Sequence, residues 1–116
     1  MLRFIKSFQY AFAGCCFLMR TQLNAWVHLL ATVTVFVLCC FFHLSTTEWA
    51  LLLIVTASVW AAELFNTAIE QIIDMVHPQW HTRAGRIKDL AAAGVLVTAI
   101  SAMGVAAFIF IPKIIH

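Results

Sequence analysis

Residues 60–74 read WAAELFNTAIEQIID and end an apolar segment that is long enough to cross a membrane. On an α-helix with about 100° between residues, the polar side chains of this stretch share one stripe about 100° wide. These side chains are Glu63, Asn66, Thr67, Glu70 and Asp74. A charged side chain at the centre of a spanning helix costs roughly 2.5–3.5 kcal/mol on insertion scales, so acids there indicate a functional site. A polar seam that joins helices is the alternative, but such a seam does not need three carboxylates on one face.

The composition is that of a membrane protein. The chain has 116 residues, of which 64% are hydrophobic and 10% are charged, whereas about 25% of the residues of soluble domains are charged. This length predicts one domain over residues 1–116, of the all-α membrane class. We expect no cleavable signal peptide, because bases and aromatics are interleaved in the first 20 residues. We also expect no nucleic-acid partner.

The four cysteines form two adjacent pairs, Cys15–Cys16 and Cys39–Cys40. Adjacent side chains on a helix diverge by about 100°, so neither pair is placed to form a disulfide. No C-x-x-C spacing for a metal or a redox centre exists. We therefore expect the cysteines to serve as small packing residues.

Residues 1–21 predict an amphipathic helix on the membrane surface. Aromatic side chains recur every four residues on one face, and polar side chains share another face. The first face carries Phe4, Phe8 and Phe12, and the second carries Arg3, Lys6, Tyr10 and Gly14. This pattern is typical of an interfacial helix on an anionic leaflet. Surface anchoring alone would explain it, and a site for an anionic ligand on the second face is the sharper hypothesis.

Three further segments are apolar enough to span a membrane, namely residues 25–44, 49–73 and 90–111. At about 1.5 Å per residue, each is long enough for a hydrocarbon core of roughly 30 Å. In the short turn STTE at 45–48, the Ser-Thr-Thr run is suitable N-cap material for the second span.

Two prolines and a polar loop set the predicted ends of these segments. Pro78 predicts the end of the second spanning helix, and Pro112 predicts the end of the third. Between them, residues 77–87 form a polar connection, after which we expect Lys88 and Asp89 to open the third helix.

Basic residues gather on one side of the predicted spans, and the other side has only Lys113. The bases on the first side are Arg3, Lys6, Arg20, Arg83, Arg86 and Lys88. The positive-inside rule therefore predicts a cytoplasmic amino terminus and an external carboxyl terminus. With that topology, the polar end of the second span, the 85–89 segment and the amino-terminal helix meet at one cytoplasmic surface.

Acids at the membrane boundary beside a basic loop indicate a polyphosphate ligand with a divalent cation. Mg²⁺ usually takes one or two carboxylates plus substrate phosphates, and phosphoryl transfer needs positioning, charge neutralisation and a base. Glu63 lies deeper in the apolar segment than Glu70, so Glu63 is the candidate base and Glu70 the candidate metal ligand. The chain has neither a Walker A motif nor a kinase Gly-rich loop.

The sequence ELFNTAIE at 63–70, followed by Asp74 and by GRIKD at 85–89, resembles the bacterial integral-membrane diacylglycerol kinases. This family includes undecaprenol kinases, and the resemblance covers essentially the whole chain. It implies a homotrimer of three-span protomers, each with an amphipathic surface helix, in the bacterial cytoplasmic (inner) membrane. It also implies active sites between protomers, where Mg²⁺ and ATP are used to phosphorylate a membrane lipid alcohol.

The resemblance further implies roles for single residues. Glu63 would be the general base with Asn66 beside it, and Glu70 would hold the metal. The nucleotide would be bound by Arg3, Tyr10, Gln22, Glu70, Gln79, Trp80, His81, Lys88 and Asp89, with Lys88 on its phosphates. The lipid would be bordered by Ser7, Phe12, Asn24 and His28, as well as by Glu63.

One position departs from the family pattern. The family usually has a second metal-binding glutamate two residues before the Asn24 position, where this chain has Gln22. An amide oxygen can bind Mg²⁺ but neutralises no charge, so Asp74 is a possible substitute ligand. At position 26, this chain has a tryptophan where the family often has a basic residue.

Several functions fit these residues. Phosphorylation of diacylglycerol is the favoured one, and the same chemistry on undecaprenol is its nearest alternative. A small multidrug exporter would need its glutamate near the bilayer centre, usually with four spans. A structural subunit or an inactive relative is the remaining alternative, which the exchange at Gln22 leaves open.

We expect Gln22→Ala to raise both the ATP KM and the Mg²⁺ concentration for half-maximal phosphate transfer, because the amide oxygen would no longer contact metal or nucleotide. Titrations of Mg²⁺ and ATP in a lipid phosphorylation assay measure both constants. Constants equal to those of the wild type would exclude Gln22 from the site.

Overall fold

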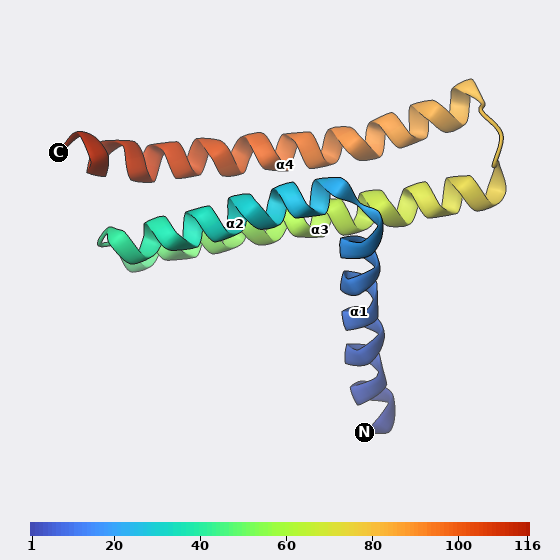
Figure 1. Cartoon of the computed structure of the whole chain (residues 1–116), viewed down its shortest axis with the longest axis horizontal. Helices are drawn as coiled ribbons and strands as arrows, with labels where there is room; N and C mark the ends of the chain where they lie inside the picture. The colour runs from blue at the N-terminus through green and yellow to red at the C-terminus, as the bar shows by residue number, and fades with distance from the viewer.

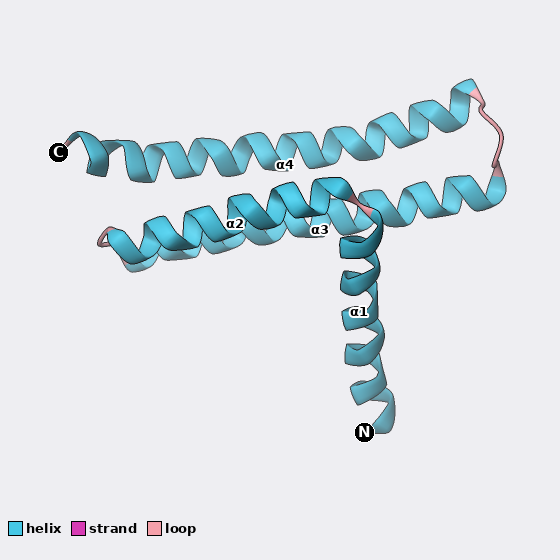
Figure 2. Cartoon of the chain, in the orientation of Figure 1, coloured by secondary structure: helices cyan, strands magenta, loops and turns pink.

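The computed structural model describes residues 1–116 and consists of helices joined by short connections (Figure 1). The four helices are α1 (Leu2–Thr21), α2 (Leu23–Phe41), α3 (Thr46–Val76) and α4 (Thr82–Ile115). No residue lies in a strand (Figure 2). The predicted all-α class is confirmed.

The helices α2, α3 and α4 run side by side, with α3 antiparallel to both neighbours, and α1 lies crosswise to them (Figure 1). The molecule measures 54 × 43 × 21 Å along its principal axes. Because a helix with its side chains is about 10–12 Å wide, the chain is about two helices thick. Such a layer encloses little interior, and only 10 of 116 residues are buried.

Three helices, α2, α3 and α4, are long and apolar enough to cross a membrane. Many of their large apolar side chains are exposed in the single chain, among them Phe36, Leu53 and Phe108. A helix satisfies its own backbone hydrogen bonds and can therefore hold such side chains in lipid. The chain is a multi-pass membrane protein.

The start of α3 is fixed by a reciprocal cap. The Ser45 hydroxyl accepts from the Glu48 backbone N–H at 3.1 Å, and the Glu48 carboxylate accepts from the Ser45 N–H at 2.9 Å. Glu48 also lies 3.3 Å from Lys113 Nζ near the end of α4. The prediction that the Ser-Thr-Thr run supplies an N-cap is confirmed, with Ser45 as the capping residue. The same glutamate ties the start of α3 to the end of α4.

Some predicted boundaries were wrong. The helix predicted to open at Lys88 and Asp89 begins at Thr82, because the His81 side chain caps it by accepting from the Arg83 N–H at 3.1 Å. Pro112 was expected to end this helix, yet α4 continues to Ile115. A proline costs one backbone hydrogen bond of the helix, and Pro112 lies in the final turns, where little helix remains to be disrupted.

The helices also differ in length from the predicted spans. The first spanning helix ends at Phe41, before the predicted residue 44, because Phe42 takes an extended backbone. The next helix, α3, extends beyond both ends of the predicted 49–73 segment. It begins after the Ser45 cap and ends at Val76, two residues before Pro78. Proline disfavours helical backbone in the residue before it, which accounts for this end.

The corner between α1 and α2 is one extended residue. Gln22, with φ −116° and ψ 115°, is the C-cap of α1 and the N-cap of α2. The Trp26 indole N–H donates to the Met19 carbonyl at 2.8 Å, and Leu18 and Ala25 are buried at the corner. These contacts fix α1 crosswise to the other helices.

The buried apolar core lies near the α2–α3 turn. It comprises Cys39, Leu52, Ile109 and Phe110, with Phe42 packed against it. All four cysteines are free thiols, so the expectation that neither adjacent pair forms a disulfide is confirmed.

We expect Ser45→Ala to destabilise the fold by about 1 kcal/mol, because the Glu48 N–H loses its capping acceptor. The melting temperature in detergent, followed by tryptophan fluorescence at one scan rate, should fall by several degrees. Thr47→Ala is the matched control, since Thr47 is exposed in the same turn of the helix. Equal melting temperatures for the two variants would contradict the role of the cap.

Candidate active site

The polar stripe of α3 passes from buried to exposed along the helix. Glu63, Asn66 and Thr67 are buried, Glu70 is half-buried and Asp74 is exposed. Glu63 has 0% of its surface exposed, although it is a carboxylate. Glu63 is therefore the most buried of the three acids in the stripe.

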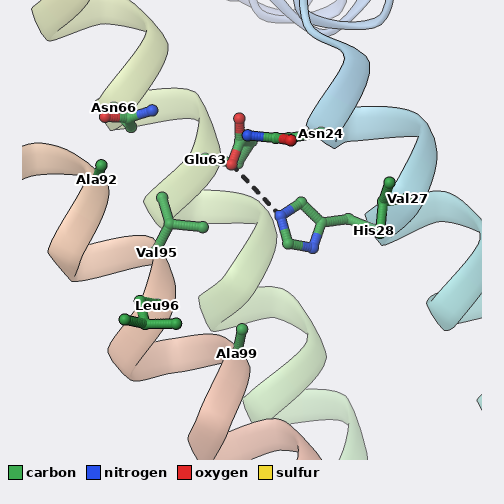
Figure 3. A pocket seen from close by; sticks show the side chains of 9 residues that line it. All are labelled: Asn24, Val27, His28, Glu63, Asn66, Ala92, Val95, Leu96 and Ala99. Atoms are coloured by element: carbon green, nitrogen blue, oxygen red, sulfur yellow. Dashed lines mark ion pairs between the residues drawn. The ribbon is translucent and has the colours of Figure 1, made fainter.

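A pocket of about 240 Å³ opens beside Glu63 between α2, α3 and α4 (Figure 3). Its polar side chains come from α2 and α3, and its apolar wall comes mostly from α4. The lining residues are Asn24, Val27, His28, Glu63, Asn66, Ala92, Val95, Leu96 and Ala99. The structure thus brings the predicted base together with Asn66 and with the predicted lipid neighbours Asn24 and His28.

His28 faces Glu63 across this pocket (Figure 3). Its Nε2 lies 3.3 Å from Glu63 Oε2, a distance that suits an ion pair, but the atoms are not aligned for a hydrogen bond. Neither carboxylate oxygen of Glu63 accepts a hydrogen bond from the protein. Buried polar atoms are nearly always paired, so these oxygens are free to accept a proton or a hydrogen bond from a ligand.

Asn66 connects the buried base to the half-buried acid. Its side-chain N–H donates to Glu70 Oε1 at 3.3 Å, while its own carbonyl oxygen has no partner. The hydroxyl of Thr67 is also buried without a partner. The stripe therefore presents several unpaired oxygen atoms in addition to its carboxylates.

The protein alone does not form a complete metal cage, since no three His, Cys, Asp or Glu side chains cluster. This suits Mg²⁺, which prefers oxygen ligands and usually keeps waters and substrate phosphates. Glu70 Oε1 accepts from Asn66, and its other oxygen has no protein partner. The donor set therefore fits a magnesium ion that is shared between one carboxylate and a phosphate ligand.

A second pocket of about 240 Å³ lies where α3 turns into α4. Lys88 of α4 forms an ion pair with Asp74 of α3 beside it. The predicted nucleotide neighbours Gln79, Trp80 and His81 line this pocket together with Lys88. Asp74, the proposed substitute metal ligand, is thus paired with a lysine, and the neighbouring Asp89 is exposed.

The predicted residues of α1 are not gathered at this end of the chain. Arg3, Ser7, Tyr10 and Phe12 are exposed, and the only hydrogen bond among them runs within α1, from the Ser7 hydroxyl to the Arg3 carbonyl. Within one chain, α1 extends away from the α3–α4 connection (Figure 1). Gln22, at the corner between α1 and α2, is half-buried.

Two residues that support the site were missed from the sequence. The Trp60 indole N–H donates to Thr32 Oγ1 at 3.0 Å, and the Thr32 hydroxyl donates to the His28 carbonyl at 2.7 Å. Helical spacing could have found both, because Trp60 precedes Glu63 by three residues and Thr32 follows His28 by four. The small α4 residues Ala92 and Ala99, which also line the pocket, were likewise not predicted as site residues.

Comparisons with known proteins place the chain among related sequences. The family model of the prokaryotic diacylglycerol kinases matches residues 9–110. The undecaprenol kinase of Bacillus subtilis is 34% identical over 112 residues, which cover 97% of this chain and 91% of that protein.

Two relatives are named diacylglycerol kinases. The one from Synechocystis sp. is 34% identical over 112 residues, which cover 96% of this chain and 64% of that protein. The one from Escherichia coli is 30% identical over 73 residues, which cover 63% of this chain and 60% of that protein. This chain therefore spans less than two thirds of either protein. On the family match and these identities, the chain belongs to the prokaryotic diacylglycerol kinase family and is a membrane enzyme that phosphorylates a lipid alcohol.

Proposed function

We propose that this chain transfers the γ-phosphate of ATP to the hydroxyl of diacylglycerol, which gives phosphatidate and ADP. The observation that carries the proposal is the buried Glu63 carboxylate, whose oxygens accept no hydrogen bond and which lines a pocket between spanning helices. Family membership favours this chemistry over that of a small exporter.

Glu63 is the proposed general base. The lipid hydroxyl oxygen attacks the γ-phosphorus, and its proton passes to a free oxygen of Glu63. The bond between the γ-phosphorus and the β–γ bridging oxygen breaks, and ADP leaves with the electron pair. A base placed beside the attacking hydroxyl typically contributes 10²–10⁴-fold to the rate. The burial of Glu63 keeps competing water away from the carboxylate.

Glu70 is the proposed Mg²⁺ ligand, with Gln22 as a second oxygen donor. When bound, Mg²⁺ would neutralise phosphate charge. Asn66 orients Glu70 by donating to Oε1. Asn66 therefore holds the Glu70 carboxylate in place and leaves its other oxygen available to a metal ion.

The pocket at the α3–α4 connection is the proposed nucleotide site. Lys88 would contact the phosphates, and the pocket wall includes Gln79, Trp80 and His81. Asp89 would also contact the nucleotide, and Arg3 and Tyr10 of α1 would complete the site. Because α1 extends away from this pocket within one chain (Figure 1), a neighbouring copy is the better source of those two side chains. This supports a homotrimer with active sites between protomers.

The lipid would enter beside α2. Asn24 lines the Glu63 pocket, and Ser7 and Phe12 of α1 are the other proposed lipid neighbours. An apolar groove of about 260 Å³ between α2, α3 and α4 adjoins the same pocket, with which it shares Val27, His28 and Ala99. Such a groove suits a hydrocarbon chain.

Undecaprenol is the second candidate substrate. The Bacillus subtilis undecaprenol kinase matches this chain over 91% of its own length, whereas the two diacylglycerol kinases match over 64% and 60% of theirs. Both lipids present a primary hydroxyl on an apolar body, so one mechanism serves either.

We place the enzyme in the bacterial inner membrane with its amino terminus in the cytoplasm. Three bases, Arg83, Arg86 and Lys88, lie in the first turns of α4, and Lys113 lies in its last turn. The positive-inside rule assigns the more basic end to the cytoplasm, where ATP is available.

We expect phosphate transfer from labelled ATP to lipid in mixed micelles, with a loss of at least about 100-fold in Glu63→Gln because the base is removed. Diacylglycerol and undecaprenol are offered separately, so that the preferred lipid is identified. Glu48→Gln is the control, since its amide can still form the α3 cap. If folded wild-type protein transfers phosphate to neither lipid, or if Glu63→Gln is fully active, the proposal is wrong.

We expect three copies per particle in mild detergent, because one chain buries few residues and keeps α1 away from the nucleotide pocket. Light scattering combined with size-exclusion chromatography measures the protein mass of the particle. A monodisperse monomer that retains full kinase activity would contradict the trimer.

A further inference from the structure

Glu63 has one basic side chain within reach. Its Oε2 lies 3.3 Å from His28 Nε2, and no lysine or arginine lines the pocket. The two side chains are 1% and 15% exposed, so little water reaches either of them. A carboxylate removed from water is stabilised only by a nearby positive charge or by hydrogen-bond donors. Of the lining side chains, only His28 can carry a positive charge.

His28 is itself held in place by a second contact between α2 and α3. The Trp60 ring packs edge-on to the His28 ring, with centroids 6.3 Å apart and an interplanar angle of 65°. The Trp60 indole N–H donates to Thr32, and the Thr32 hydroxyl donates to the carbonyl of His28. Trp60 and Glu63 lie on one face of α3, as His28 and Thr32 lie on one face of α2. Two polar contacts, one turn apart, therefore keep the imidazole close to the carboxylate.

We propose that His28 is a positioning residue for Glu63, and that in the lipid complex its Nε2–H turns to donate to the nearby Oε2, which leaves Oε1 to accept the proton of the lipid hydroxyl. Nε2 carries a proton both in the imidazolium and in one neutral tautomer, so either form can donate. The inference rests on the proposed role of Glu63 as base, and it gives His28 a task beyond bordering the lipid.

Two substitutions at His28 separate the positioning of Glu63 from a role in bordering the lipid. His28→Leu removes the donor, and His28→Gln keeps an N–H at a similar distance along the side chain. We expect His28→Leu to lower kcat at least roughly tenfold, because a misplaced catalytic group is costly, with the lipid KM nearly unchanged. His28→Gln should recover much of that loss, and His43→Leu, at the α2–α3 turn, should match the wild type.

The opposite pattern would overturn the inference. A histidine that only borders the lipid predicts a raised lipid KM with an unchanged kcat in both variants. If His28→Leu keeps the wild-type kcat while Glu63→Gln is inactive, the positioning role fails and the proposed base remains. If Glu63→Gln is fully active, the proposed function itself fails.

A spectroscopic measurement tests the contact without relying on activity. In ¹⁵N-histidine-labelled protein, the His28 ring signals are identified by their loss in His28→Gln. We expect these signals to move in Glu63→Gln and the His43 signals to stay in place. Unmoved His28 signals in folded, oligomeric Glu63→Gln would show that the imidazole does not hold the carboxylate, and would refute the proposal.

Discussion

The site depends on the Glu63 carboxylate, which is kept out of water although it lies on a helix that can span a membrane. Removing Glu63 from water costs free energy that the site must offset. The residues around it follow from this requirement. α2 supplies His28 at 3.3 Å, and α4 closes the pocket with side chains such as Ala92 and Ala99. Small residues allow α4 to approach closely, so the pocket stays narrow and mostly apolar around one ionisable pair.

Helix length explains how one helix could serve both a membrane lipid and the proposed nucleotide. α3 has 31 residues and α2 has 19, which correspond to about 46 Å and 28 Å of helix. A short turn joins them at one end, so the excess of α3 extends beyond the start of α2 at the other end (Figure 1). Glu70 and Asp74 lie toward this extension, while Glu63 lies beside α2. The same helix therefore carries one buried acid, Glu63, and an exposed acid, Asp74.

Much of the fold could be predicted from local patterns. The spans follow from long apolar runs, and the start of α3 follows from Ser45 and Glu48, since a capping box needs only four consecutive residues. The ends of α4 could not be predicted in this way. The His81 ring caps the helix before Lys88, and the turn that contains Pro112 stays helical near the ion pair between Lys113 and Glu48. These ends depend on side-chain rotation and on contacts between helices, which apolarity does not encode.

The sequence by itself determined the polar stripe of α3, because a helix places residues three and four apart on one face whatever surrounds it. It also determined that this stripe belongs to a membrane protein, because composition alone separates lipid-facing helices from soluble ones. Only the tertiary structure decided which neighbours the stripe meets. The Glu63–His28 pair joins residues 35 positions apart, and the Trp60–Thr32 bond joins residues 28 apart. Such distances are closed by the register between helices, and that register is set by tertiary contacts rather than by any local motif.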